Sequence, residues 1–305
     1  MGNDVQVSAP TEDRHPGSTG MDTASTLEVL RMLNDEDAKV AGAVAEVLPE
    51  LAVLVDRAVA AIRAGGHVHY FGAGTSGRLA VLDAAELLPT FNAPDGMFVA
   101  HHAGGHGALL RAVENVEDDD EAGRRAASVV TAGDVAIGLT ASGRTPFVGG
   151  ALQRARQAGA VTALVTSNPH AGLAAHADHV LVADTGPEVL TGSTRLKAGT
   201  AQKMVLNAFS TAVMVRLGRT WSNLMVDLVA TNAKLRGRVL RILQEASGAP
   251  EADVRAALDR AGGELKPALL ALLADIDVPA ARAALVQHHG SVAEAVAGLA
   301  ARDSA

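Results

Sequence analysis

The fold is decided by a stretch that opens with a short strand-like run and closes with a glycine-rich turn: His67-Val68-His69-Tyr70-Phe71-Gly72-Ala73-Gly74-Thr75-Ser76-Gly77. The first five residues are bulky and mostly apolar or aromatic, which is typical of a short strand. The glycines that follow mark a turn, and residues 78–87 then have a helical pattern. A strand, a tight turn and a helix in this order predict the first half of a βαβ unit.

The same alternation continues along the chain on the C-terminal side of this stretch. Further strands are predicted at 96–100, 134–139, 161–166 and 179–182, with helical segments between them, such as 146–158. Short apolar strands that alternate with helices indicate parallel pairing. We therefore predict an α/β fold built on a doubly wound, mainly parallel five-stranded sheet, with a helical N-terminal arm and a helical C-terminal bundle.

Three parts are expected along the chain. Residues 1–20 are polar and contain Gly and Pro, which predicts a flexible arm. Residues 21–248 should form the α/β domain with flanking helices, including long helices over 195–218 and 222–245. Residues 249–305 hold shorter helical patterns separated by Gly and Pro, which predicts a small helical domain.

Composition excludes several kinds of chemistry. The chain of 305 residues has no Cys, so disulfides, thiolate catalysis and Cys-ligated metals are excluded. A formal net charge of -8 disfavours a nucleic-acid partner. We find neither an apolar signal-like segment near the start nor a long apolar stretch that would span a membrane. The expectation is a cytoplasmic protein without a nucleic-acid or membrane partner.

Two predicted strand-to-helix turns carry the strongest chemical signal. They are Gly74-Thr75-Ser76-Gly77 and Ser142-Gly143-Arg144-Thr145. A helix N-terminus presents free N–H groups and a partial positive charge, glycine allows close approach, and hydroxyls add donors. An ordinary capped turn explains either segment equally well when it is taken alone. Two such turns in one sheet favour a phosphate site at the carboxyl ends of the strands.

Other site types fit less well. Gly72, Gly74 and Gly77 spell the glycine pattern of dinucleotide sites, but the second strand lacks the acidic residue that such sites need. The three nearby histidines His101, His102 and His106 have loose spacing and no accompanying ligand motif, so no metal site is expected from them. Ser142 lacks the glycine-flanked elbow of a nucleophilic serine.

Longer motifs now become recognisable, and they resemble the N-acetylmuramic acid 6-phosphate etherases, a family with the sugar isomerase (SIS) fold. The resemblance covers about residues 34–227. The matching blocks are 34–37, 72–79, 82–86, 89–91, 103–105, 114–118, 141–146, 186–203 and 223–227. The block 186–203, which includes Gly186-Pro187-Glu188-Val189-Leu190-Thr191-Gly192-Ser193, is long and unusual enough to be highly specific.

The resemblance implies a function and a set of site residues. It implies cleavage of the lactyl ether of a phosphorylated amino sugar, without a metal or organic cofactor, in a homodimer whose sites are completed by the neighbouring subunit. Glu86 matches the family's proton donor and Glu117 its second carboxylate, the expected base. The candidate ligands of the sugar phosphate are Gly74, Thr75, Ser76, Gly77, Arg78, Ser142, Gly143, Arg144, Thr145, Lys197 and Lys203.

Alternative interpretations remain open from the residues alone. A glutamate on an amphipathic helix is usually a solvated surface charge, and Glu117 begins an acidic run that suits a helix start. Lys197 and Lys203 share a helical face that is either part of an anionic site or an ordinary solvated surface. An aldose–ketose isomerase with the same fold and a sugar-phosphate-sensing regulator are the alternative functions.

Overall fold

The computed structural model describes residues 9–227 and 233–303. It divides into two compact units, one made of Met1–Ala85 with Gly96–Ser210 and the other of Glu86–Asp95 with Thr211–Ala305. The division after residue 210 falls well before residue 249, where the sequence places the start of the helical domain. Apolar residues before residue 249, such as Leu243, share a core with the helices that follow it.

A five-stranded parallel sheet forms the centre of the first unit. Its strands are β1 (Val68–Gly72), β2 (Phe98–His102), β3 (Val135–Leu139), β4 (Val161–Thr166) and β5 (His179–Val182). They lie in the order β2-β1-β3-β4-β5, and every neighbouring pair is parallel. The predicted α/β class and five-stranded sheet are confirmed. The chain order reverses between β1 and β3, which is where doubly wound sheets bind ligands.

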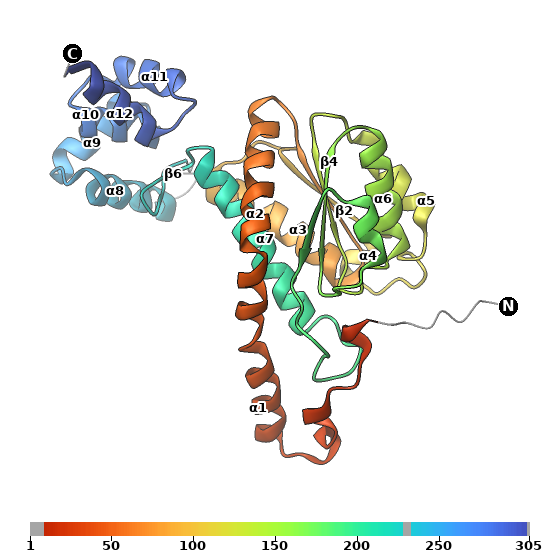
Figure 1. The fold of residues 1–305 in the computed structure, drawn as a ribbon. Coiled ribbons are helices and arrows are strands. Elements are labelled where there is room, and N and C mark those ends of the chain that lie inside the picture. The colour runs from red at the N-terminus through yellow and green to blue at the C-terminus, as the bar shows by residue number, and fades with distance from the viewer. Residues whose placement is uncertain (1–8, 228–232, 304–305) are drawn as a thin grey trace. The chain divides into compact units, whose positions relative to one another are not determined.

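Helices cover both faces of this sheet (Figure 1). One face carries α2 (Val40–Arg63), α3 (Gly74–Phe91) and the first part of α7 (Lys197–Arg216), and the other carries α5 (Asp120–Ala126) and α6 (Pro146–Gln157). The remaining helices of this unit are α1 (Thr26–Asp37), α4 (Gly105–Leu110), η1 (Pro10–Glu12), η2 (Pro16–Ser18), η3 (Met21–Thr23), η4 (Ala127–Val129) and η5 (Gly172–His176).

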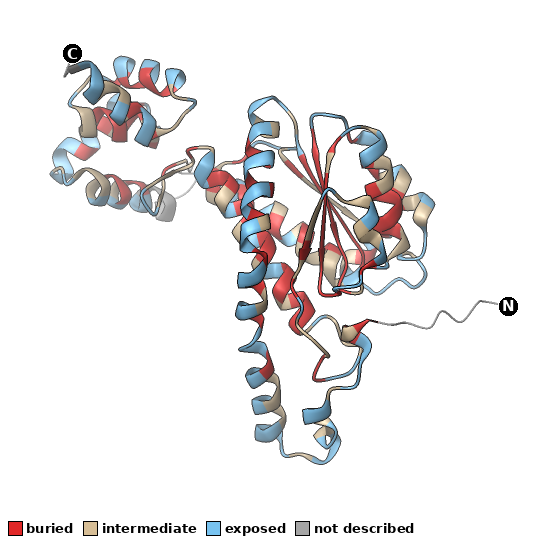
Figure 2. Cartoon of the chain, viewed as in Figure 1, coloured by how far each residue is buried: buried red, intermediate tan, exposed pale blue. Residues whose placement is uncertain are grey.

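Burial on both faces explains the apolar strands. Every residue of β1 and β3 is buried, as the red strands of Figure 2 show. Phe71 packs with Val148 and Leu152 of α6 on one face. On the other, the Tyr70 ring lies 6.4 Å from Phe209 of α7. Apolar burial on both faces is the dominant stabilising term for such a sheet.

The segment before α1 makes contacts with the rest of this unit. Residues 1–8 of the expected flexible arm lie outside the described residues. Thr11 is buried, and the Ser18 hydroxyl donates a hydrogen bond of 2.7 Å to the carbonyl of Val189. Helix α1 then begins with a capping box, in which Ser25 and Glu28 each bond the other's backbone N–H.

The second unit is mainly helical, and it corrects one predicted helix. Residues 222–245 were expected to be helical throughout, but β6 (Thr220–Trp221) and β7 (Leu224–Met225) form an antiparallel hairpin. Its two-residue turn holds Ser222 at a φ of 50°, outside the helical region. Residues 228–232 of the predicted helix lie outside the described residues. The hairpin side chains pack against the helical core, and that burial outweighs helical propensity.

The helices of this unit enclose their own apolar core. They are α8 (Ala233–Ser247), α9 (Glu251–Arg260), α10 (Leu265–Ala274), α11 (Val278–Gln287) and α12 (Val292–Asp303). Leu243, Val254, Leu269 and Val292 are each fully buried within it. Among the described residues, no helix combines the length and the apolar character that a membrane span requires.

Candidate active site

The first predicted turn lies where β1 meets α3. Gly74 is the first helical residue, with a φ of 54°, and Thr75 and Ser76 are half-buried behind it. A Cβ on Gly77 would lie 2.0 Å from His102 Nδ1 and 2.5 Å from the carbonyl oxygen of Gly72. Glycine is therefore required here for α3 to approach the sheet closely. The turn presents the N–H groups of an 18-residue helix at the carboxyl edge of the sheet.

The second predicted turn follows β3 and is held by its own hydroxyl groups. Thr140 Oγ1 lies 2.8 Å from Thr145 Oγ1 and accepts a 3.2 Å hydrogen bond from the N–H of Gly143. Gly143 has a φ of 70°, and the side-chain amide of Asn168 donates to the Ser142 carbonyl at 2.8 Å. The turn is thus fixed before any ligand arrives. Sequence reasoning missed Thr140 and Asn168, which position this turn.

Glu117 lies directly beside the second turn. Its carbonyl oxygen accepts a 3.0 Å hydrogen bond from the N–H of Phe147, in the first turn of α6. The loop that carries it also contains Asn115, whose φ is 62°. The Glu117 carboxylate is exposed, so it remains available to a ligand. A contact between residues 30 positions apart therefore fixes the backbone of this predicted catalytic residue.

A cavity of about 390 Å³ joins the first turn to Glu117. Its lining comes from the start of α3, the end of β2 and the loop before α5. Gly74, Arg78, His102 and Glu117 are among the residues that form its wall. This volume is in the range of small-molecule sites, and the wall includes both a helix start and a carboxylate.

Arg78 has a structural role in this cavity. Its Nε donates to the carbonyl of Leu109 at 2.9 Å, and its Nη2 donates to the carbonyl of Ala108 at 2.8 Å. These bonds satisfy carbonyls at the end of α4 and hold that short helix against α3. Arg78 thus lines the cavity with its hydrogen bonds already directed to the protein. Arg144 is exposed in the second turn.

The two predicted lysines have different environments. Lys197 is 2 % exposed, and its ammonium group forms a 2.7 Å ion pair with Glu36. Burial opposes ionisation of Glu36, but hydrogen bonds from Lys197 and Lys39 outweigh it and lower the pKa of that carboxyl to about 2. Lys203 is exposed. Neither lysine is among the residues that line the cavity beside Glu117.

The start of α7 is capped by a buried carboxylate that sequence reasoning did not single out. Both oxygens of Glu188 accept backbone N–H bonds of 3.0 Å, from Lys197 and from Ala198. A Cβ on Gly199 would lie 3.4 Å from the methyl group of Thr75, so the first turns of α7 and α3 are in contact. The long motif at 186–203 therefore contains the residues that cap α7 and place its first turn against the start of α3.

Glu86 occupies a different place from Glu117. It is exposed on α3, twelve residues and just over three turns after Gly74. It is not among the residues that line the cavity beside Glu117. One turn before it, Asp83 is buried and accepts hydrogen bonds from the hydroxyls of Tyr70, at 3.0 Å, and Ser210, at 2.9 Å. These contacts link α3 to β1 and α7.

Two family models match this chain. The model described as "Glucokinase regulatory protein N-terminal SIS domain" matches residues 50–156, and the model described as "SIS domain" matches residues 109–212. Among solved structures, a phosphoheptose isomerase from Francisella tularensis is 17% identical, covers 63% of this chain and 100% of that chain, and has a TM-score of 0.52. That similarity supports the fold alone.

Curated relatives decide the family. The N-acetylmuramic acid 6-phosphate etherase of Thermobifida fusca is 62% identical over 268 residues, which cover 88% of this chain and 88% of that protein. The enzyme of the same name from Pectobacterium atrosepticum is 53% identical over 291 residues, or 94% and 96% of the two chains. The chain belongs to the N-acetylmuramic acid 6-phosphate etherase family. The resemblance inferred from the sequence motifs is confirmed.

Membership of the etherase family indicates which part of the structure to consider as the active site. The turn at Gly74, the turn at Ser142 and the loop at Glu117 lie at one edge of the sheet, beside the point where its strand order reverses. Etherase relatives are named for a substrate that carries a phosphate. A helix start suits a phosphate, and a carboxylate can act as an acid or a base.

Proposed function

We propose that this chain cleaves the D-lactyl ether of N-acetylmuramic acid 6-phosphate, giving N-acetylglucosamine 6-phosphate and D-lactate. It is then a carbon–oxygen lyase of cell-wall sugar recycling and acts in the cytoplasm. The observation that carries the proposal is the cavity in which the start of α3 meets Glu117, in a chain of the etherase family. A cavity of about 390 Å³ is large enough for a sugar phosphate.

In this proposal the phosphate binds to the two turns. The N–H groups at the start of α3 and the hydroxyls of Thr75 and Ser76 bind its oxygens, with Gly74 open to the ligand and Gly77 holding α3 close to the sheet. Ser142 adds a hydroxyl from the second turn, and exposed Arg144 adds positive charge. Thr145 and Gly143 contribute by holding that turn in shape.

The lysines and Arg78 support the phosphate site in different ways. Arg78 and Lys197 already have protein partners, so their role is to hold α4 and α7 beside the first turn. Lys203 is exposed and remains a candidate for direct contact with the substrate. Arg78 adds positive charge beside the cavity, whereas the charge of Lys197 is offset by Glu36.

The reaction needs one base and one acid. Lactate is a poor leaving group as an alkoxide, so its departing oxygen must be protonated. In the ring-opened sugar, carbon 2 lies beside an aldehyde, which makes its proton removable. Glu117 accepts that proton, the carbon–oxygen bond at carbon 3 breaks, and Glu86 gives a proton to the departing lactate. Water then adds at carbon 3 of the unsaturated aldehyde and a proton returns to carbon 2.

The proposal includes a homodimer with shared sites, as the resemblance to the etherases implies. Glu117 lines the cavity, whereas Glu86 is exposed three turns along α3 from the first turn. In a symmetric pair, Glu86 of one subunit completes the cavity of the other. Each subunit then gives one carboxylate to each site.

Release of D-lactate from the purified protein tests this proposal. With the muramic substrate, Glu117→Gln and Glu86→Gln should each lower kcat by about 100-fold or more, because each removes an acid–base group. Glu121→Gln on α5 and Glu46→Gln on α2 are matched controls, since both residues are exposed glutamates. In ²H₂O the product should carry deuterium at carbon 2. Full lactate release by both site variants would contradict the mechanism.

Mixing the two inactive variants tests the shared site. A random mixture of Glu86→Gln and Glu117→Gln subunits contains half mixed dimers, each with one intact site, so about a quarter of the wild-type activity should return. No recovery after subunit exchange, in dimers verified by mass, would show that each site uses both glutamates of one chain.

A further inference from the structure

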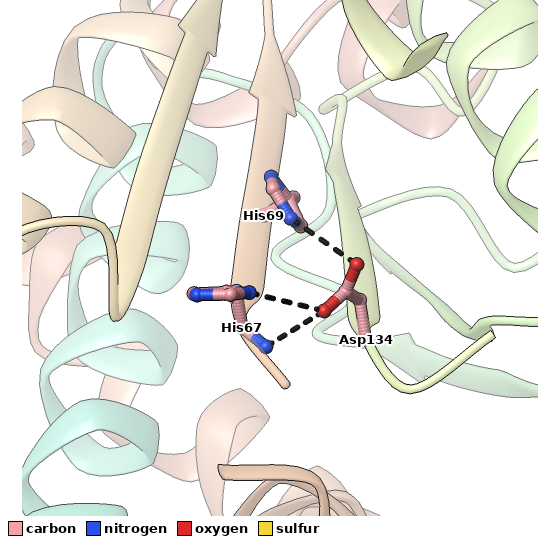
Figure 3. Close-up of side chains that lie close together, drawn as sticks. All are labelled: His67, His69 and Asp134. Carbon is pink, nitrogen blue, oxygen red and sulfur yellow. Dashed lines mark hydrogen bonds and ion pairs between the residues drawn. The ribbon is translucent and has the colours of Figure 1, made fainter. Parts of the chain in front are cut away.

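A group of metal-binding side chains lies at the opposite edge of the sheet from the two turns. His67 precedes β1, His69 lies within it, and Asp134 immediately precedes β3. Val68 and Val135 are paired in register, so His67 and Asp134 lie side by side at the starts of adjacent parallel strands. Figure 3 shows both imidazole rings directed toward the Asp134 carboxylate.

Two of the distances between ligand atoms are close to those around a tetrahedral ion. His67 Nδ1 lies 3.4 Å from Asp134 Oδ1, and His69 Nε2 lies 3.7 Å from Asp134 Oδ2. One ligand atom from each of the three residues lies within 4.8 Å of the others. Zinc bonds to nitrogen and oxygen are about 2.0–2.2 Å, which places tetrahedral ligands about 3.3–3.6 Å apart. A small inward movement of the rings would complete the coordination.

An unpartnered buried nitrogen is a second, independent observation that favours a cation at this position. The His69 side chain is only 6 % exposed, and its Nε2 has no hydrogen-bond partner in the structure. Its 3.7 Å distance from the carboxylate is too long for a hydrogen bond. The other ring nitrogen, Nδ1, lies 3.1 Å from His101 Nε2. When Nδ1 donates its proton there, the Nε2 lone pair faces an anionic oxygen, an arrangement that a cation stabilises.

Surrounding contacts hold the ligands in place. Asp134 accepts backbone hydrogen bonds from His67, at 2.8 Å, and from Thr131, at 2.7 Å, and a third from the Thr131 hydroxyl at 2.9 Å. These bonds orient its carboxylate in the way that outer contacts orient ligands in metal sites. The His67 side chain is half exposed, which gives an ion access and leaves a position for water.

We propose that His67, His69 and Asp134 bind one zinc ion. Two imidazoles and one carboxylate favour zinc over magnesium or calcium, which prefer oxygen ligands alone. The ion would link the start of β1 to the start of β3. Since the site lies at the amino ends of these strands, it takes no part in the reaction proposed above and stands independently of it.

Zinc binding by the full-length protein tests the proposal. After removal of metals with a chelator, titration calorimetry with Zn²⁺ should give one site per chain. His67→Ala should weaken binding by at least a hundredfold while leaving the His67 backbone N–H bond to Asp134 intact. His106→Ala is the matched control, because His106 is an exposed histidine of α4 outside the proposed site, and it should leave the affinity unchanged. Cobalt in place of zinc should give the visible absorption of a four-coordinate ion.

The alternative results are equally decisive. Absence of saturable zinc binding by the wild type would overturn the proposal, as would unchanged affinity in His67→Ala. Loss of zinc binding in His106→Ala, with binding by His67→Ala unaffected, would overturn the proposal and place the ion at α4 instead. Circular dichroism of metal-free His67→Ala checks that the variant is folded. Thermal unfolding is the second readout: removal of zinc should lower the midpoint of the wild type and leave that of His67→Ala unchanged.

Discussion

Replacement of Asp83 by Asn should change how the stability of the first unit depends on pH. Asp83 is 7 % exposed and connects three elements, because it accepts hydrogen bonds from Tyr70 of β1 and Ser210 of α7. Burial raises its pKa to about 6, even though the hydrogen bonds from Ser210 and Tyr70 act in the opposite direction. An unfolded chain has no such burial, so its aspartate keeps the ordinary value of 3.8.

The magnitude follows from this difference in pKa. About two pH units at about 1.4 kcal/mol each give about 3 kcal/mol. The folded protein binds the proton of Asp83 more tightly than the unfolded chain does. The favourable contribution of Asp83 is therefore complete below pH 4 and is lost as the pH rises from about 4 to about 6. Asparagine keeps an oxygen acceptor and has no proton to lose, so it removes this dependence.

The measurement compares the variant with the wild type. The free energy of unfolding is obtained from urea titrations at several values between pH 4 and pH 7. Tyr70 is the only tyrosine of the chain, so its ultraviolet absorbance reports on this cluster. The value for Asp83→Asn minus that for the wild type should rise by about 3 kcal/mol from pH 4 to pH 7. Taking the difference cancels the titration of all other groups.

A flat difference across this range would refute the reasoning, because it would mean that Asp83 titrates alike in the folded and unfolded chains. A difference that falls with pH would mean that the carboxylate is stabilised as an anion. Asp95→Asn is a suitable control, since Asp95 is exposed and should give no systematic trend.

Two further substitutions test the packing of the site. Gly77→Ala would place a Cβ 2.0 Å from His102 Nδ1 and should lower the free energy of unfolding by about 3 kcal/mol. Gly107→Ala is the control, because a Cβ there meets open space on α4, and it should change the free energy by less than about 1 kcal/mol. Urea titrations measure both values. Lys197→Met removes the buried partner of Glu36 and leaves that carboxylate with Lys39 and His15 alone, so it should destabilise by about 2 kcal/mol. Lys203→Met, exposed on the same helix, should stay within about 0.5 kcal/mol by thermal unfolding. Equal effects of the two lysine changes, or a stable Gly77→Ala protein, would contradict the described packing.

Local pattern alone predicted the sheet and its two turns. The five strands are found within about two residues of their expected positions, because short apolar runs bounded by glycine have few other structures available. The motif at 186–203 identified the family, which the curated relatives confirm. By contrast, the hairpin at residues 220–225 was missed, since the partly buried Trp221, Leu224 and Met225 pack against the helical core and such packing is not a local property of the sequence.

The uses of individual charged groups were decided only by tertiary structure. From the sequence, Arg78 and Lys197 were available cations, yet one binds carbonyls 30 residues away and the other a carboxylate 161 residues away. Contacts distant in sequence also give Asp83 its hydrogen-bond donor Ser210 and fix the backbone of Glu117 against Phe147. The type of a residue determines which bonds its side chain can make. Which bonds it makes depends on the groups that folding brings within about 3 Å of it, and on the water that folding removes.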